Sequence, residues 1–221
     1  MLTVHHLNNS RSQRVLWLLE ELGVPYEIVR YQRQPDMRAP KELRAIHPLG
    51  KSPVITDGGN TIAESGAIVE YLIGTYGNDR FIPPADTPER LRYTYWLHYA
   101  EGSAMPPLLL KLLFTIMPKR APALLRPLVR KVSNQALTVL VNPQLKQHMA
   151  FWESELAKTE WFAGAEFTAA DIQMSFPLEA AAARSGLEVG HPKAMAFLDR
   201  THARPAYQRA LDKGGAYTVG R

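Results

Sequence analysis

The fold of the first part of the chain is decided by residues 51–65, which read Lys-Ser-Pro-Val-Ile-Thr-Asp-Gly-Gly-Asn-Thr-Ile-Ala-Glu-Ser. Val54–Thr56 and Thr61–Ala63 flank the turn formers Asp57–Asn60, which predicts a β-hairpin. Ser65 can then cap a helix, because a serine hydroxyl accepts from the first free backbone N–H groups. That helix places five apolar residues on one side: Ile68, Val69, Leu72, Ile73 and Tyr76.

A strand, a helix and a second strand are predicted before this stretch. Alternate residues from Leu2 to His6 suit a short strand, and apolar residues recur every three or four positions over 15–22. Gly23 supplies a helix stop, and residues 26–31 read as the second strand. A short helix is expected over residues 41–46, so the order is βαβ followed by ββα. This order predicts a small α/β domain with a mixed sheet.

The chain is expected to divide into two domains. Residues 1–80 form the α/β domain, and the turn formers at 78–88 read as a linker. No convincing strand follows, so residues 89–221 are predicted to be all helical.

The helical part carries one strong local signal and one proline-rich segment. Thr168 and Asp171 form a capping box flanked by Phe167 and Ile172, and we interpret it as a structural helix start. Short helices and bends are expected over 105–150, because proline breaks helices. The segment holds six prolines: Pro106, Pro107, Pro118, Pro122, Pro127 and Pro143.

Composition excludes several kinds of chemistry. The chain has 221 residues, 46% of them hydrophobic, and no cysteine. It therefore has no disulfide, no redox CxxC pair, no thiolate zinc site and no cysteine nucleophile. Any sulfur chemistry must use the sulfur of a ligand. The N-terminus lacks the regions of a secretory signal, and no apolar run reaches the ~20 residues of a membrane span, so a cytoplasmic location is expected.

The basic excess is concentrated in one segment. The net charge is +5, yet residues 105–150 contain seven basic residues and no acidic one. We interpret this segment as the wall of a substrate pocket with a solvated face. Peripheral contact with an anionic membrane is the less favoured alternative, and no nucleic-acid-binding module is recognisable.

Familiar catalytic motifs are absent from the sequence. Gly50-Lys51-Ser52 resembles the end of a P-loop, but Ala45 stands where that motif needs glycine. The seven histidines show no His-Glu-x-x-His pair, so no metal is expected. No serine has the Gly-x-Ser-x-Gly setting of a hydrolase.

Three segments remain as candidates for a binding site. The polar loop 8–14 opens a helix, whose N-terminus favours an anion such as a thiolate; Ser10 or Ser12 alternatively caps that helix. In 47–55, a cis Ser52–Pro53 bond would turn the Ser52 backbone toward an extended ligand, although few X–Pro bonds are cis. In 64–68, Glu64 and Ser65 suit an amino-acid head group, or they simply begin a helix.

Together these segments resemble the cytosolic glutathione transferases, over essentially the whole chain. The resemblance rests on Ser10 with Arg14, the Pro-Leu-Gly-Lys-Ser-Pro run at 48–53, Glu64-Ser65 and the Thr168–Asp171 box. It is closest to a serine-type subgroup of bacterial and fungal members. The family implies a thioredoxin-like N-terminal domain, a C-terminal bundle of helices that forms the electrophile site, and usually a homodimer.

The resemblance also implies roles for individual residues. Ser10 matches the catalytic serine, with Asn9 as its rival for stabilising the thiolate. Glu64 and Ser65 match the residues that hold the γ-glutamyl end of glutathione. The backbone of Ser52, beside the cis proline Pro53, matches the partner of its cysteinyl residue. Three further residues complete the implied set, Lys51 and Arg38 for the glycyl carboxylate and Glu101 for the glutathione of the partner subunit.

The implied reaction is attack of the glutathione thiolate on a hydrophobic electrophile, as in detoxification. Glutathione is the co-substrate, and no cofactor is expected. Two alternatives stay open: glutathione-dependent peroxidase or dehalogenase chemistry at the same site, and a non-catalytic protein that binds hydrophobic ligands or a partner.

Overall fold

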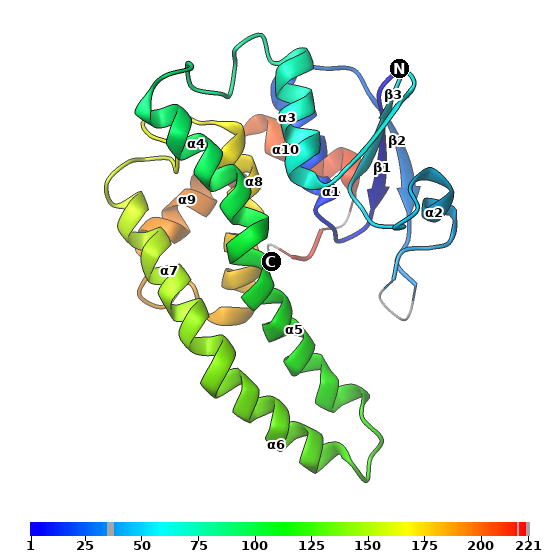
Figure 1. Cartoon of the computed structure of the whole chain (residues 1–221), viewed down its shortest axis with the longest axis vertical. Coiled ribbons are helices and arrows are strands. Elements are labelled where there is room, and N and C mark those ends of the chain that lie inside the picture. Colours follow the sequence, from blue (N-terminus) through cyan, green and yellow to red (C-terminus); the bar gives the residue numbers. More distant parts are fainter. Residues whose placement is uncertain (35–37, 216, 220–221) are drawn as a thin grey trace.

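The structure, a computed structural model, describes residues 1–34, 38–215 and 217–219 (Figure 1). Four strands form one sheet in the order β2-β1-β3-β4. β1 runs parallel to β2 and antiparallel to β3, which pairs antiparallel with β4. The predicted mixed sheet is therefore confirmed. The strand bounds are β1 Thr3–Leu7, β2 Glu27–Tyr31, β3 Val54–Asp57 and β4 Asn60–Ala63.

Three helices accompany the sheet, as the sequence predicted. α1 (Ser12–Leu22) and α3 (Ser65–Tyr76) lie between the sheet and the helical region, and α2 (Glu42–Ile46) lies on the other side of the sheet (Figure 1). α1 ends at Gly23, which adopts the left-handed conformation with φ 70° that glycine accepts without strain.

α1 is buried on all sides, whereas the sequence predicted one apolar face. Residues 15–19 are fully buried, including Leu16 and Trp17, which lie outside the predicted face. The reason is that α8 and α10 of the helical region cover the side of α1 that faces away from the sheet. The Trp17 ring meets that of Tyr207 edge to face, with the centroids 5.1 Å apart.

The remainder of the described chain is helical, as expected. Among the described residues, no helix combines the length and apolar character needed to cross a bilayer. Three helices, α4, α9 and α10, begin with proline, which is favourable there because the first helical N–H has no intrahelical partner. The helix bounds are α4 Pro88–Tyr99, η1 Ala100–Ala104, α5 Met105–Arg120, α6 Arg126–Ala136, η2 Leu137–Val141, α7 Asn142–Leu156, α8 Ala169–Ser185, α9 Pro192–His202 and α10 Pro205–Gly214.

The expectation of short, bent helices over 105–150 is wrong. α4, η1 and α5 follow one another without a break, and so do α6, η2 and α7, giving two long rods side by side (Figure 1). Both η1 and η2 are π-helical turns, and Pro106 and Pro143 each come two residues after one of them. A wider π turn leaves room for a proline ring that would clash with the carbonyl four residues earlier in a regular helix.

The predicted capping box at the start of α8 is present. The side chain of Asp171 accepts from the N–H of Phe162, and from the N–H and hydroxyl of Thr168, at 2.8 to 2.9 Å. Burial raises the pKa of Asp171 to about 6, while these donors favour the carboxylate. The carboxylate of Asp171 therefore joins the start of α8 to the preceding loop, which agrees with the interpretation of the capping box as a structural helix start.

Candidate active site

Ser10 lies in the turn between β1 and α1 and is buried. Its Oγ accepts from the backbone N–H of Ser12 at 3.2 Å and lies 2.8 Å from the Ser12 Oγ. It also lies 3.3 Å from the Oγ of Ser52, on the loop before β3. The residue at the N-cap of α1 is Arg11, which has no side-chain cap, so Ser10 is not the cap; its hydroxyl binds the first N–H of the helix and faces the loop that carries the cis proline.

A hydrogen-bond network extends from Ser10 into the protein. The Oγ of Ser12 lies 2.9 Å from Nδ1 of His6. Burial lowers the pKa of His6 to about 4, so the ring is neutral at pH 7. The Ser12 Oγ also donates to the carbonyl of Leu7 at 3.3 Å, so the network joins Ser10 through Ser12 to His6 and to the end of β1.

The Ser52–Pro53 peptide bond is cis, as the resemblance implied. The Ser52 hydroxyl donates to the carbonyl of His5 at 3.3 Å. Within the described part of the chain, the backbone N–H and C=O of Ser52 have no intramolecular partner. Both groups are therefore open to an extended ligand that lies along the loop.

The start of α3 differs from the capping interpretation. The helix begins at Ser65, and the residue before it, Glu64, has no side-chain cap. The buried Ser65 hydroxyl instead accepts from Nη2 of Arg14 at 3.4 Å. Glu64 is exposed and has φ 72°, a conformation that costs a non-glycine residue roughly 1–3 kcal/mol. The first N–H groups of α3 are left without a side-chain cap.

Arg14 of α1 and Arg11, which directly precedes that helix, share one carboxylate of the helical region. Arg14, only 2% exposed, donates to Glu101 and to the carbonyl of Gln173. The Nε of Arg11 lies 3.1 Å from the other oxygen of Glu101. Burial lowers the pKa of Arg11, and the charge of Glu101 opposes that effect. Glu101 is thus held by two arginines of its own chain, and its contact with the glutathione of the partner subunit stays a prediction.

Lys51 and Arg38 are both exposed, on the loops before β3 and α2. Lys51 is next to Ser52 in the sequence, whereas Arg38 directly follows residues 35–37, which lie outside the described part of the chain. Neither lines the cleft described next.

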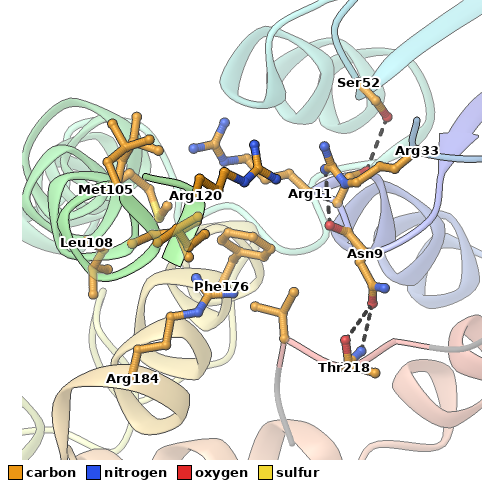
Figure 2. A pocket seen from close by; sticks show the side chains of 16 residues that line it. Asn9, Arg11, Arg33, Ser52, Met105, Leu108, Arg120, Phe176, Arg184 and Thr218 are labelled. Carbon is orange, nitrogen blue, oxygen red and sulfur yellow. Dashed lines mark hydrogen bonds between the residues drawn. The ribbon is translucent and has the colours of Figure 1, made fainter. Parts of the chain in front are cut away.

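A cleft of about 520 Å³ runs from Ser10 and Ser52 to the helical region (Figure 2). Its wall on that side is apolar and comes mainly from α5, with Phe176 of α8. This supports the interpretation of the basic, apolar segment as a pocket wall. The lining residues of α5 are Met105, Leu108, Leu109, Leu112, Leu113, Ile116 and Arg120.

The C-terminal segment closes one side of this cleft. The side-chain oxygen of Asn9 accepts from the N–H of Thr218 at 2.8 Å and from its hydroxyl at 3.0 Å (Figure 2). Tyr217 donates to the buried carboxylate of Glu179 on α8 at 2.5 Å. Thr218 and Val219 consequently line the cleft.

Two family models match the chain. Residues 1–73 match "Glutathione S-transferase, N-terminal domain", and residues 116–205 match "Glutathione S-transferase, C-terminal domain". Glutathione S-transferase 3 of Schizosaccharomyces pombe is 40% identical over 181 residues, covering 82% of this chain and 74% of that protein. The chain belongs to the glutathione S-transferase family. This transferase is also 32% identical to Glutathione S-transferase 1 of Saccharomyces cerevisiae, over 98% of this chain and 96% of the yeast protein.

Solved structures of transferases share the fold. A glutathione S-transferase from Actinobacillus pleuropneumoniae is 31% identical with a TM-score of 0.79, covering 100% of this chain and 96% of that one. The theta class enzyme of Xanthomonas axonopodis pv. citri, solved with glutathione bound, is 25% identical with a TM-score of 0.74, covering 98% and 99%. The expected family and the expected combination of a thioredoxin-like domain with a helical domain are confirmed.

Sequence reasoning missed several residues of the transferase's cleft. Arg33, Phe176 and Arg184 line it but were not proposed, because they come from segments far apart in the chain. Arg11 also lines it and lies in the candidate loop 8–14, but it was given no role of its own. The π turn that places Glu101 also had no sequence signal beyond the prolines that follow it. The absence of acidic residues from 105–150 is the one signal that pointed toward a basic cleft.

Proposed function

We propose that this transferase catalyses attack of the glutathione thiolate on an electrophilic carbon of a hydrophobic substrate. One observation carries the proposal: the Ser10 hydroxyl lies 3.3 Å from the hydroxyl of Ser52, whose backbone groups are unpaired within the described chain, at the point where the apolar cleft begins. A cysteinyl residue paired with Ser52 would bring its sulfur to Ser10, with the electrophile held against α5.

The remaining candidates would hold the two ends of the tripeptide. Ser65 and the free N–H groups of α3 suit the α-carboxylate of the γ-glutamyl end, and Glu64 suits its ammonium group. Lys51, with Arg38, would meet the glycyl carboxylate. The buried Arg14 supports this arrangement, because it donates to Ser65 from behind.

The thiolate would be stabilised by local charge and by a hydroxyl donor. A free thiol has a pKa of ~8.5, and each unit by which it falls corresponds to ~1.36 kcal/mol in favour of the thiolate. The start of α1 and the Arg11 guanidinium supply positive charge beside Ser10. To donate to sulfur, Ser10 directs its hydroxyl proton at the ligand and not at the neighbouring hydroxyls of Ser12 and Ser52. Asn9 is the rival donor through its side-chain amide.

Two measurements test the proposal. Calorimetric titration with reduced glutathione should give saturable binding, and the enzyme should conjugate 1-chloro-2,4-dinitrobenzene to glutathione. Cumene hydroperoxide, assayed in parallel, separates transferase from peroxidase chemistry. Folded protein that gives no saturable heat with glutathione would overturn the proposal, and binding without turnover would favour the non-catalytic alternative.

The proposal includes a cytoplasmic homodimer that removes reactive electrophiles. Exposed apolar residues on α6 and η2, among them Leu128, Val132 and Leu140, support a subunit interface on this rod. Light scattering should give a dimer, which Leu128→Ser with Val132→Ser weakens and the exposed control Val189→Ser does not. A monomer that floats with anionic liposomes would favour membrane contact instead.

A further inference from the structure

The cleft of this protein has an unusual charge. Four arginines line it, and none of its described lining residues is acidic. We propose, on the basis of the function proposed above, that the electrophile carries a carboxylate, which Arg120 and Arg184 bind. The four arginines are Arg11, Arg33, Arg120 and Arg184.

Arg120 ends an apolar row on α5. Leu108, Leu112 and Ile116 line the cleft at intervals of four residues, and Arg120 is the next position in that row. α8 likewise has an apolar lining residue followed by a lining arginine. Phe176 and Arg184 both line the cleft and lie eight residues apart. Both arginine side chains extend from their helices into the space between these walls (Figure 2). An amphiphile with an apolar body and an anionic end matches this order.

The four arginines differ in what they already bind. Arg11 pairs with Glu101, and Arg33 donates to the backbone carbonyl of Asn9. Arg120 and Arg184 make no hydrogen bond or ion pair to any residue that the structure describes. A planar guanidinium binds a carboxylate through two parallel hydrogen bonds, stronger than those between neutral groups. These two arginines are therefore the ones available to a ligand.

Helix stability gives both arginines a second role. Each lies in the last turn of its helix, where a cation interacts favourably with the helix dipole. The interaction with the helix dipole does not require the side chain to line the cleft. If it were the only role, substitution would change the stability of the protein slightly and leave the preference for an anionic substrate unchanged. Experiment can therefore separate the dipole role from carboxylate binding.

The reaction used for the test is chemically simple. The probes are 4-chloro-3,5-dinitrobenzoate and its methyl ester, which have the same ring and leaving group and differ in charge. The glutathione sulfur forms a bond to the ring carbon that carries chlorine, the C–Cl bond breaks, and chloride leaves with the electron pair. The carboxylate forms and breaks no bond in these steps, but it withdraws electrons from the ring less than the ester does, so the uncatalysed rates of the two probes differ and must be measured.

Wild-type enzyme should prefer the acid over the ester in kcat/KM by about tenfold, after correction for the uncatalysed rates. Arg120→Gln and Arg184→Gln should each reduce this preference, and the double variant should abolish it. Arg126→Gln, on α6 outside the cleft, is the matched control and should retain the preference. Added salt should weaken the preference in wild type.

A binding measurement separates failure of this inference from failure of the proposed function. Calorimetric titration with 3,5-dinitrobenzoate and its methyl ester, which lack the leaving group, measures the same preference without turnover. The inference is supported, even if no conjugation occurs, when wild type binds the acid more tightly than the ester and the double variant binds the two equally. Equal binding of acid and ester, a preference that survives in the double variant, or a raised KM for glutathione in that variant would overturn it.

Discussion

The carboxylate of Glu101 binds the guanidinium of Arg14 across the boundary between the sheet and the helical region. Arg14 comes from α1 and is buried, and its other hydrogen bonds reach Ser65 on α3 and the carbonyl of Gln173 on α8. One side chain therefore connects the start of α3, where the γ-glutamyl end of glutathione is proposed to bind, to two helices of the other domain.

Removing the charge of Glu101 should destabilise the fold. Glu101→Gln leaves Arg11 and Arg14 without their shared counter-ion, and because Glu101 itself is 28% exposed, water offsets part of the loss. We expect the free energy of unfolding to fall by about 1–2 kcal/mol. Urea denaturation measures this change. Glu70→Gln, which removes an exposed carboxylate, is the control, and equal stability of the two variants would contradict the prediction.

Ser10→Ala tests the thiolate donor. Loss of the hydroxyl should lower kcat by about tenfold or more near pH 6.5 and raise the apparent pKa of kcat by about one unit. Ser12→Ala is the informative partner, because it removes the hydroxyl that is hydrogen-bonded to Ser10 and should preserve activity. An unchanged rate and pH profile in Ser10→Ala would remove Ser10 from the mechanism and favour Asn9.

His6 should make the folded protein sensitive to acid. Burial lowers the pKa of His6 to about 4, so between pH 6.5 and pH 4 the unfolded chain binds a proton that the folded chain does not. The free energy of unfolding therefore falls as the pH drops through this window, by up to about 3 kcal/mol from this residue. His6→Asn, whose amide can still form a hydrogen bond with Ser12, should remove that part of the pH dependence.

The control for His6 is the exposed histidine of α4. His98→Asn makes the same substitution at a side chain that is 65% exposed, and it therefore shows what the change of residue does without loss of a buried ring. Denaturation curves at intervals of half a pH unit would show the difference. Identical slopes for wild type and His6→Asn would contradict the prediction.

Asn9 should control the order of the C-terminal segment. Asn9 has φ 50°, so glycine can replace it without strain while removing both hydrogen bonds to Thr218. We expect amide exchange at Thr218 to become about tenfold faster in Asn9→Gly, as the loss of about 1.4 kcal/mol implies. Hydrogen-exchange mass spectrometry measures this. Unchanged exchange would show that Tyr217 and Glu179 alone hold the segment.

Most of the fold could be predicted from local patterns. The hairpin over 54–63, the helix stop at Gly23 and the capping box at Thr168 depend on residues within a few positions of one another. The long rods could not be predicted, because proline signals a break locally. Only the π turns before Pro106 and Pro143 show that the helices continue through them.

Only those residues of the site that lie next to the start of a helix or strand could be predicted from the sequence. Ser10, Ser52 and Ser65 each begin or precede an element, so their exposed backbone or hydroxyl groups had a local signal. Arg184 and the Glu101–Arg14 pair had none, because each depends on how the helical region packs against α1.

The amino-acid sequence alone determined that the reactive sulfur must come from a ligand, since the chain has no cysteine. It also determined the order of strands and helices, because hydrophobic periodicity and turn residues act over short range. Tertiary structure decided which cations face the cleft, that the Ser10 hydroxyl lies beside those of Ser12 and Ser52, and that Asn9 binds Thr218. Such contacts join residues separated by up to about the full chain, and their geometry is set by packing that no local pattern encodes.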